Sequence, residues 1–241
     1  INSAIYSRSG GSLGIGFAIP ANMVKVVVEQ AMNGGKSVRR PWLGAKLQRV
    51  TPDIAESLGL PRPTGVLVQA VVPDSPAAKA GLKVGDLIVA VEGQAVDDPQ
   101  SLNYRFATRP IGGKAALAVS RSGKEHSLIV VLEGAPETPP REEVTLRARS
   151  PFAGATVANL SPAVAEELRV DPGVPGIAIY SVDDGTPAAA AGFKPGDVIV
   201  EVNGQKMERT RDLDILTRAP QRAWRVTVVR GGRTISALLP G

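Results

Sequence analysis

Short runs of valine, isoleucine and leucine, separated by turns that contain glycine and proline, make up most of the hydrophobic pattern of this chain. Runs of this length, such as residues 87–91, are typical of buried β-strands. Helical spacing is rarer and is clearest at Val24, Val27 and Val28, within residues 21–32. We therefore predict a mainly β protein with a few short helices.

The first 38 residues have the pattern of a strand, a polar loop, a second strand and a helix. Residues 1–6 and 14–19 alternate as strands do, residues 21–32 form the helix, and Asn33-Gly34-Gly35 ends it. Two strands and one helix are too few to bury a core of their own. We expect this segment to be the end of a larger domain, and to pack on the following domain or on a second copy of the chain.

A repeat with an offset of about 110 residues covers most of the remaining chain. Ser-Pro-Ala-Ala-Lys-Ala-Gly-Leu-Lys-Val-Gly-Asp, starting at Ser75, matches Thr-Pro-Ala-Ala-Ala-Ala-Gly-Phe-Lys-Pro-Gly-Asp, starting at Thr186. Ser75 and Thr186 are typical helix N-caps, and the proline after each suits a first helical turn. The dipeptides Glu92-Gly93 and Asn203-Gly204 predict tight turns. A period this long indicates two tandem domains of about 90 residues each.

Each copy ends with a predicted helix and hairpin. The two hairpins pair residues 116–120 with 127–132 and residues 224–229 with 234–239. Between the copies, prolines 136, 139 and 140 stand among charged residues, which predicts a semi-rigid exposed linker. The predicted organisation is an N-terminal segment at 1–38, a first domain at 39–133, a linker at 134–148 and a second domain at 149–241.

Composition limits the chemistry. The 241 residues include no cysteine and one histidine, which excludes disulfides and thiol nucleophiles, and we expect no metal site and no cofactor. The net charge is +5, but the basic residues are scattered and only 4% of residues are aromatic, so we do not expect nucleic-acid binding. No run approaches the ~20 apolar residues of a membrane-spanning helix.

The repeated Ser/Thr-Pro-Ala-Ala-x-Ala-Gly-Leu/Phe-Lys-x-Gly-Asp-x-Ile signature resembles the bacterial PDZ domain. Gly-Ile-Gly-Phe-Ala-Ile-Pro at residues 14–20, followed by a helix and Pro41-Trp42-Leu43-Gly44, is similar to the HtrA/DegP serine protease family, where it closes the trypsin-like barrel. The resemblance implies two tandem PDZ-like domains, each a partly open β-barrel with two short helices. They would follow a strand-loop-strand-helix remnant of a trypsin-like protease domain.

The sequence lacks the catalytic motif of that family. The nucleophile of family members lies in Gly-Asn-Ser-Gly-Gly, which is absent here, and Ser9-Gly10-Gly11 matches only three of its residues. His126 falls in the hairpin of the first repeat, far along the chain from Ser9, whereas a triad needs its groups within hydrogen-bond reach. We expect no catalysis by this segment, and a periplasmic serine endopeptidase as the parent protein.

The resemblance implies that the PDZ domains capture peptides by β-augmentation. A ligand adds a strand to an exposed sheet edge, and its terminal carboxylate enters a nest of backbone N–H groups. The candidate residues of the first domain follow Pro41 or lie on the helix across the groove: Trp42, Leu43, Gly44, Ala45, Lys46, Leu47, Leu102, Arg105 and Phe106. Leu102 and Phe106 would line an apolar pocket or, alternatively, fill the core, and Arg105 would reach an acidic ligand residue. Trp42 would either hold the preceding helix or form the rim of the groove.

The second copy matches this pattern less well, because Ala153 replaces the aliphatic residue of the loop. Its candidate residues are Phe152, Ala153, Gly154, Ala155, Leu213 and Leu216. The expected ligands are C-terminal or extended peptides of misfolded proteins, and the expected partners are the protease domain of the parent chain and further copies in a homo-oligomer. The alternative is a non-catalytic assembly module whose PDZ domains mainly mediate oligomerisation.

Overall fold

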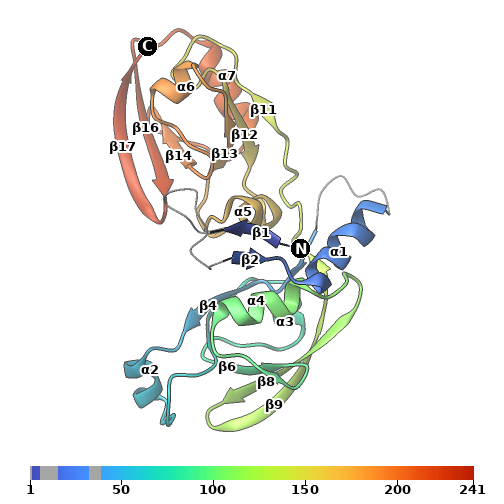
Figure 1. Cartoon of the computed structure of the whole chain (residues 1–241). Helices are drawn as coiled ribbons and strands as arrows, with labels where there is room; N and C mark the ends of the chain where they lie inside the picture. The colour runs from blue at the N-terminus through green and yellow to red at the C-terminus, as the bar shows by residue number, and fades with distance from the viewer. Residues whose placement is uncertain (1, 6–15, 33–38) are drawn as a thin grey trace. The chain divides into compact units, whose positions relative to one another are not determined.

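The computed structural model describes residues 2–5, 16–32 and 39–241. The chain divides into two compact units, Ile1–Gly134 and Ala135–Gly241 (Figure 1). The loop of the predicted N-terminal segment that contains Ser9, Gly10 and Gly11 lies outside the described residues. Both units are mainly β, which confirms the predicted fold class.

The N-terminal segment contains a two-stranded pair and a helix. Strand β1 (Asn2–Ile5) pairs antiparallel with β2 (Gly16–Ala18), and α1 (Ala21–Met32) spans the residues predicted from its hydrophobic spacing. The side chain of Asn22 in α1 donates a hydrogen bond to the hydroxyl of Tyr104, at 3.1 Å. No α1 side chain is buried, so this contact with the first domain is polar and exposed rather than an apolar packing.

The first unit is built on a sheet in the order β4-β5-β6-β8-β9, with β7 paired to β6. A separate short pair joins β3 (Pro41–Trp42) to β10 (Glu133–Gly134). In this order β4 and β9 form the two edges. The other elements of the unit are β4 (Ala45–Arg49), α2 (Pro52–Ser57), β5 (Val66–Val71), α3 (Pro76–Lys79), β6 (Leu87–Val91), β7 (Gln94–Ala95), α4 (Pro99–Ala107), β8 (Lys114–Arg121) and β9 (Lys124–Val131).

The second unit repeats this order and adds one strand. Its sheet runs β11-β12-β13-β14-β16-β17, with β15 paired to β14. The added strand, β11, comes from the segment predicted to be an exposed linker. The elements are β11 (Val144–Thr145), β12 (Ala155–Asn159), α5 (Pro162–Leu168), β13 (Ile177–Val182), α6 (Pro187–Ala190), β14 (Val198–Val202), β15 (Gln205–Lys206), α7 (Thr210–Arg218), β16 (Ala223–Arg230) and β17 (Arg233–Pro240).

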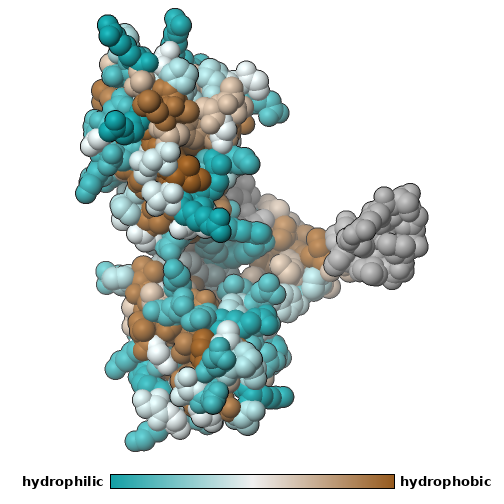
Figure 2. All heavy atoms as spheres, turned by 90° about the vertical axis from the view of Figure 1, so that its left-hand side faces the viewer, coloured by the Kyte–Doolittle hydropathy of each residue, from teal (hydrophilic) through white to brown (hydrophobic). Residues whose placement is uncertain are grey.

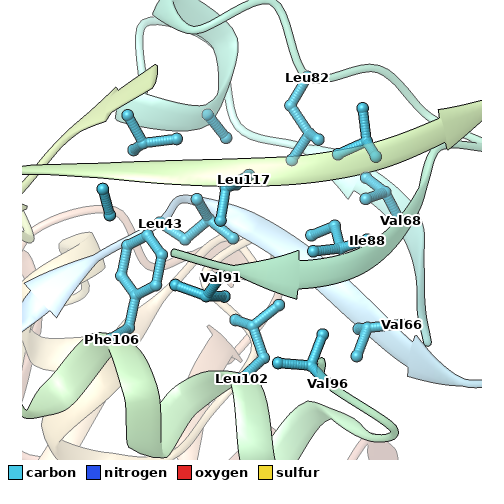
Figure 3. Close-up of a cluster of buried hydrophobic side chains, with 14 of the residues drawn as sticks. Leu43, Val66, Val68, Leu82, Ile88, Val91, Val96, Leu102, Phe106 and Leu117 are labelled. Carbon is cyan, nitrogen blue, oxygen red and sulfur yellow. The ribbon is translucent and has the colours of Figure 1, made fainter. Parts of the chain in front are cut away.

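Each unit buries its own hydrophobic core. In the first, Leu102 and Phe106 extend from α4 toward Val91 and Leu43 (Figure 3). In the second, the ring of Phe152 stacks on Phe193 and meets Trp224 edge-on, with centroids 5.2 and 5.6 Å apart. Apolar side chains also reach the surface in patches between hydrophilic ones (Figure 2).

The local features predicted from the repeat are present in both units. The hydroxyl of Ser75 caps α3 by accepting the N–H of Ala78 at 3.2 Å, and Thr186 caps α6 in the same way. The predicted tight turns lie between β6 and β7 and between β14 and β15, where Glu92 and Asn203 have positive φ. The predicted hairpins are β8–β9 and β16–β17. Their strands extend one to three residues beyond the predicted ends, except that β9 ends at Val131, one residue earlier than expected.

An ion pair between a buried aspartate and a partly exposed arginine is also repeated, and we did not predict it from the sequence. Arg121 on β8 contacts both carboxylate oxygens of Asp86, at 2.6 and 2.7 Å, and donates to the carbonyl of Gly81. Arg230 on β16 makes the same contacts with Asp197 and Gly192. Because Asp86 and Asp197 are almost fully buried, each depends on its arginine and on nearby backbone N–H groups for compensation of its charge.

Candidate functional site

The glycine loop of the first unit, residues 42–45, directs backbone N–H groups away from the body of the domain. The carbonyl of Leu43 accepts the N–H of Ala77 in α3 at 2.9 Å, and the carbonyl of Gly44 accepts that of Val72 at 2.8 Å. In a planar trans peptide the N–H points opposite to the carbonyl, so the N–H groups of Gly44 and Ala45 point away from α3 and β5. Neighbouring donors that point the same way can form a nest for an anion.

Only glycine suits the turning point of this loop. Gly44 has a φ of +74°, and a Cβ added there would lie 2.2 Å from Cβ of Ser75, the N-cap of α3. The indole of Trp42, which is half-buried, lies against the same position. The loop and the N-cap therefore pack too closely for a side chain between them.

Strand β4 continues from this loop as a sheet edge. It pairs with β5 on one side, and no strand among the described residues pairs with its other side. Ala45 and Leu47 are half-buried and pack against the core, while Lys46 between them is exposed. Helix α4 contacts both β3 and β4. An apolar strand edge, a helix beside it and a glycine loop thus lie together.

The helix residues predicted to line a pocket belong to the core in this structure. Leu102 is 0% and Phe106 3% exposed, and both lie in the cluster that contains Leu43 (Figure 3). This is the second of the two interpretations that the sequence left open. Burial follows from their spacing of four residues, which puts both on the face of α4 that covers the sheet.

Arg105 differs from its predicted role. Its guanidinium donates to the side chain of Gln94 and, at 3.0 Å, to the carbonyl of Ala95, both in β7. It is therefore engaged within its own domain rather than presented to an acidic ligand residue.

An ion pair that the sequence did not suggest links the strand to the helix at the far end of β4. Arg49 lies 3.2 Å from Asp98, which is the N-cap of α4. The backbone N–H of Ser101 and the nearby Arg49 hold the pKa of Asp98 below its ordinary value. The hydrophobic pattern contains no signal for this contact, because both side chains belong to polar positions that the fold brings together.

The second unit has the same loop but not the same free edge. Gly154 has a φ of +89°, and the carbonyls of Ala153 and Gly154 accept N–H groups from Ala188 and Asp183. Here, however, the N–H of Gly154 donates to the carbonyl of Leu146 at 2.9 Å, and β11 pairs with β12. The other predicted residues of this domain lie in or against its core: Phe152, Ala155 and Leu213 are 0% exposed and Leu216 is partly buried.

The expectation of an exposed linker is wrong for the residues next to this loop. Leu146 is 0% exposed and lies in the core of the second unit. Composition suggested a solvated linker, but Val144 and Leu146 alternate with polar residues, and this alternation allows a strand with one buried face.

Of the residues considered for catalysis, only His126 lies among the described residues. His126 is exposed on β9, and Ser9 lies outside the described residues. In the described ranges no three His, Asp or Glu side chains cluster in a way that could hold a metal ion. The same residues include no helix that is both long and apolar enough to span a membrane.

Comparison with known proteins agrees with this architecture. The PDZ domain family matches residues 41–132 and 151–239. The chain is 38% identical to a probable periplasmic serine endoprotease DegP-like of Brucella suis, covering 95% of this chain and 44% of that protein. A protein of the same description from Pseudomonas putida is 37% identical, with 97% and 49% covered.

Among solved structures, the HtrA-type protease AlgW with a decapeptide is 39% identical over 56% of this chain and 42% of its own, with a TM-score of 0.43. The chain spans slightly less than half the length of the two DegP-like relatives. The chain belongs to the PDZ domain family, contains two tandem copies of that domain, and is a relative of the HtrA/DegP-like serine endoproteases.

Proposed function

We propose that this chain is the peptide-binding region of a periplasmic HtrA/DegP-type serine endopeptidase. Its first PDZ domain would capture the hydrophobic C-termini of unfolded proteins by β-augmentation, for protein quality control. The observation that supports this most directly is the edge of β4, which begins at a loop whose N–H groups point away from the domain body. An extended peptide can pair with such an edge while its carboxylate accepts the loop N–H groups.

The chemistry around this edge suits a peptide with an apolar terminal residue. Ala45 and Leu47 offer half-buried apolar surface on β4. Arg39 and Arg40, both exposed, precede the loop by three and two residues and add positive charge near it in the sequence, which favours an anionic ligand. A free carboxylate and a short paired strand would together give an affinity near micromolar, about 8 kcal/mol.

The proteolytic and cellular parts of the proposal rest on the relatives. The two DegP-like proteins are described as probable periplasmic serine endoproteases, and this chain spans less than half of each. The captured peptide would be passed to a protease domain of the parent protein, which would work as a homo-oligomer. The alternative is an assembly module in which the same edge binds a neighbouring subunit.

The experiment is a titration with two matched peptides that end in an apolar residue, one with a free carboxylate and one amidated. The chain has two tryptophans, one in each domain, so a Trp224→Phe variant leaves Trp42 of the glycine loop as the reporter. We expect the free acid to change Trp42 fluorescence at micromolar to tens of micromolar, and the amide to bind at least about tenfold more weakly because it lacks the anion.

Two substitutions locate the binding. Leu47→Glu places a charge on the half-buried face of β4 and should abolish binding of the free acid. Ile129→Glu makes the same change at an exposed position of β9, the opposite edge, and should leave binding unchanged. Binding of neither peptide to the folded chain would contradict capture at this edge, and a mass that rises with concentration in sedimentation would then favour the assembly module.

A further inference from the structure

The free edge of the second PDZ domain is paired with the chain's own segment 140–146. Within it, β11 runs antiparallel to β12, with Val144 opposite Val157 and Thr145 opposite Thr156. The pairing continues at Leu146, whose N–H donates to the carbonyl of Ala155 and whose carbonyl accepts the N–H of Gly154, both at 2.9 Å. A segment with this direction and these bonds makes the main-chain contacts of an added strand.

Leu146 takes the position that a ligand's terminal residue would have. Its carbonyl accepts the N–H of the loop glycine, the donor that would otherwise face a carboxylate. Its side chain is fully buried in the cluster that contains Phe152, next to the loop, and Leu213 of α7. The segment thus fills both the anion position and the apolar position at this end of β12.

The other end of the segment is held from both sides. The backbone N–H of Asn159, at the end of β12, donates to the carbonyl of Arg141 at 2.7 Å, and its side-chain amide donates to that of Pro140 at 2.8 Å. Thr210, the first residue of α7, donates its hydroxyl to the carbonyl of Glu142 at 3.0 Å. Asn159 and Thr210 are 0% and 1% exposed, and Oδ1 of Asn159 accepts the N–H of Thr210. Strand β12 and helix α7 therefore both hydrogen-bond the segment through buried polar residues.

Arg141 adds an electrostatic anchor. It lies 2.7 Å from Glu167 of α5 and 2.8 Å from Glu137, and its guanidinium covers the ring of Tyr180 on β13 at 5.5 Å. The hydrogen bond and charge of Arg141 lower the pKa of Glu167, so the pair stays ionised at neutral pH. The anchor fixes the start of the segment on elements outside the β12–α7 pair.

We propose that residues 140–146 are a built-in peptide ligand of the second PDZ domain, with Leu146 in the terminal position. While the segment is docked, the second domain is closed to peptides from outside. This inference concerns the second domain alone and holds whether or not the first domain captures peptides.

The docked segment competes strongly with outside peptides for the edge of β12. A tethered ligand acts at an effective concentration in the millimolar range, whereas a short peptide binds such an edge near micromolar. An outside peptide of comparable intrinsic affinity would therefore bind roughly 1,000-fold more weakly than to an open domain. The first domain has no comparable segment in sequence, since Gly34, Gly35 and Lys36 stand where Val144, Thr145 and Leu146 stand in the second.

The test is to weaken the segment and offer its sequence back as a free peptide. A Trp42→Phe variant leaves Trp224, whose ring meets Phe152 beside the second loop, as the only tryptophan. The probe is Glu-Glu-Val-Thr-Leu, residues 142–146, with a free carboxylate. We expect no response of the otherwise intact chain at 100 µM peptide, an order-of-magnitude ceiling. After Leu146→Ala the peptide should bind roughly 10- to 30-fold more tightly.

Equal binding before and after Leu146→Ala would overturn the inference, and so would a folded Leu146→Ala chain that binds no peptide, because the segment would then be an ordinary structural strand. Since the first domain has no tryptophan in this variant and gives no fluorescence signal, neither result depends on peptide capture at β4.

Hydrogen exchange on the unaltered chain provides a second test if Leu146→Ala fails to fold. The amides of Leu146 and Gly154 should exchange at least about tenfold faster than that of Ile179 in β13, because undocking is a local opening. Arg141→Ala should speed exchange at Leu146 and Gly154 but not at Ile179, whereas Arg218→Ala, which removes an exposed ion pair of α7, should change neither. Exchange of Leu146 at the rate of Ile179 would show that the segment leaves only when the domain unfolds.

Discussion

The two PDZ domains of this chain share a strand order, a capped Pro-Ala-Ala helix and an ion pair between a buried aspartate and an arginine, yet they differ at the strand beside the glycine loop. In the first, β4 is an edge of the described sheet, and the exposed pair Arg49–Asp98 connects it to α4. In the second, β12 is covered by β11, and buried Asn159 and Thr210 hold the covering segment. The same framework therefore supports one edge that pairs with no further strand among the described residues and one edge that pairs with a segment of its own chain.

This difference originates outside the repeated signature. The glycine, its positive φ and the two carbonyls that turn the loop are the same in both domains. What changes is the preceding sequence, where alternating Val144 and Leu146 can bury one face of a strand and Gly34-Gly35 cannot. Availability of a PDZ edge thus depends on residues that a domain signature does not include.

The largest expected effect tests what the domains share. Arg121→Leu and Arg230→Leu each remove the partner of a buried carboxylate, and each should destabilise its own domain by about 3 kcal/mol or more. Denaturant unfolding followed by Trp42 for the first domain and Trp224 for the second measures both. Arg218→Ala, at an exposed ion pair, is the control and should change stability by less than about 1 kcal/mol. A loss of similar size in the untouched domain would show that the two are not independent folding units.

The next largest effect tests the segment that covers β12, the feature that distinguishes the second domain from the first. Leu146 and Leu213 are equally buried, but Leu213 belongs to α7 whereas Leu146 belongs to the covering segment. Leu213→Ala should cost the second domain about 2–5 kcal/mol, as core truncations do. Leu146→Ala should cost less, about 2 kcal/mol or below, because undocking of the segment limits the loss. Unfolding curves followed by Trp224 decide this, and a greater loss for Leu146→Ala would contradict a detachable segment.

Sequence alone predicted much of this fold because its signals are local. Residues 21–32 had helical spacing, Ser75 and Thr186 had N-cap chemistry, and the Gly-containing turns required positive φ, so each feature could be recognised within a few residues. The repeat added the tandem arrangement. Recognising these features does not require knowing which residues far apart in the sequence are in contact in the fold.

The parts of the candidate site that were not predicted depend on contacts between residues far apart in the sequence. Arg105 binds β7, Arg49 binds the N-cap of α4, and Leu146 packs beside the second loop. The Asp86–Arg121 and Asp197–Arg230 pairs had a signal in the sequence, because both partners recur at matching positions of the repeat. Comparing the residues before each loop would have been a second signal, since Val144 and Leu146 have no apolar counterparts.

A smaller effect is expected from acid on the first domain. Burial alone would raise the pKa of Asp86, but hydrogen bonds from Arg121 and from the N–H of Lys83 outweigh it, so the pKa lies below its ordinary value of 3.8. A carboxyl with a depressed pKa stabilises the folded state above the ordinary value and loses that contribution as the pH falls through the folded value. Melting of the first domain, followed by Trp42, should therefore move to lower temperature below about pH 4. Asp86→Asn should weaken this dependence, and an unchanged dependence would assign it to other carboxyls.

The smallest effect concerns the two N-caps. Ser75→Ala and Thr186→Ala each leave one helical N–H without its side-chain acceptor, which should cost the respective domain about 1 kcal/mol. Thr186→Ser keeps the hydroxyl and should recover most of the loss in the second domain. The loss at Ser75 should be at least as large as that at Thr186, because Ser75 is 1% exposed and its cap bond is shorter, 3.2 against 3.4 Å. Both caps pack against the loop glycines, so the Ser75→Ala chain should also be tested for peptide binding through Trp42. Unchanged binding together with reduced stability would separate the shared framework from the strand edge that distinguishes the first domain.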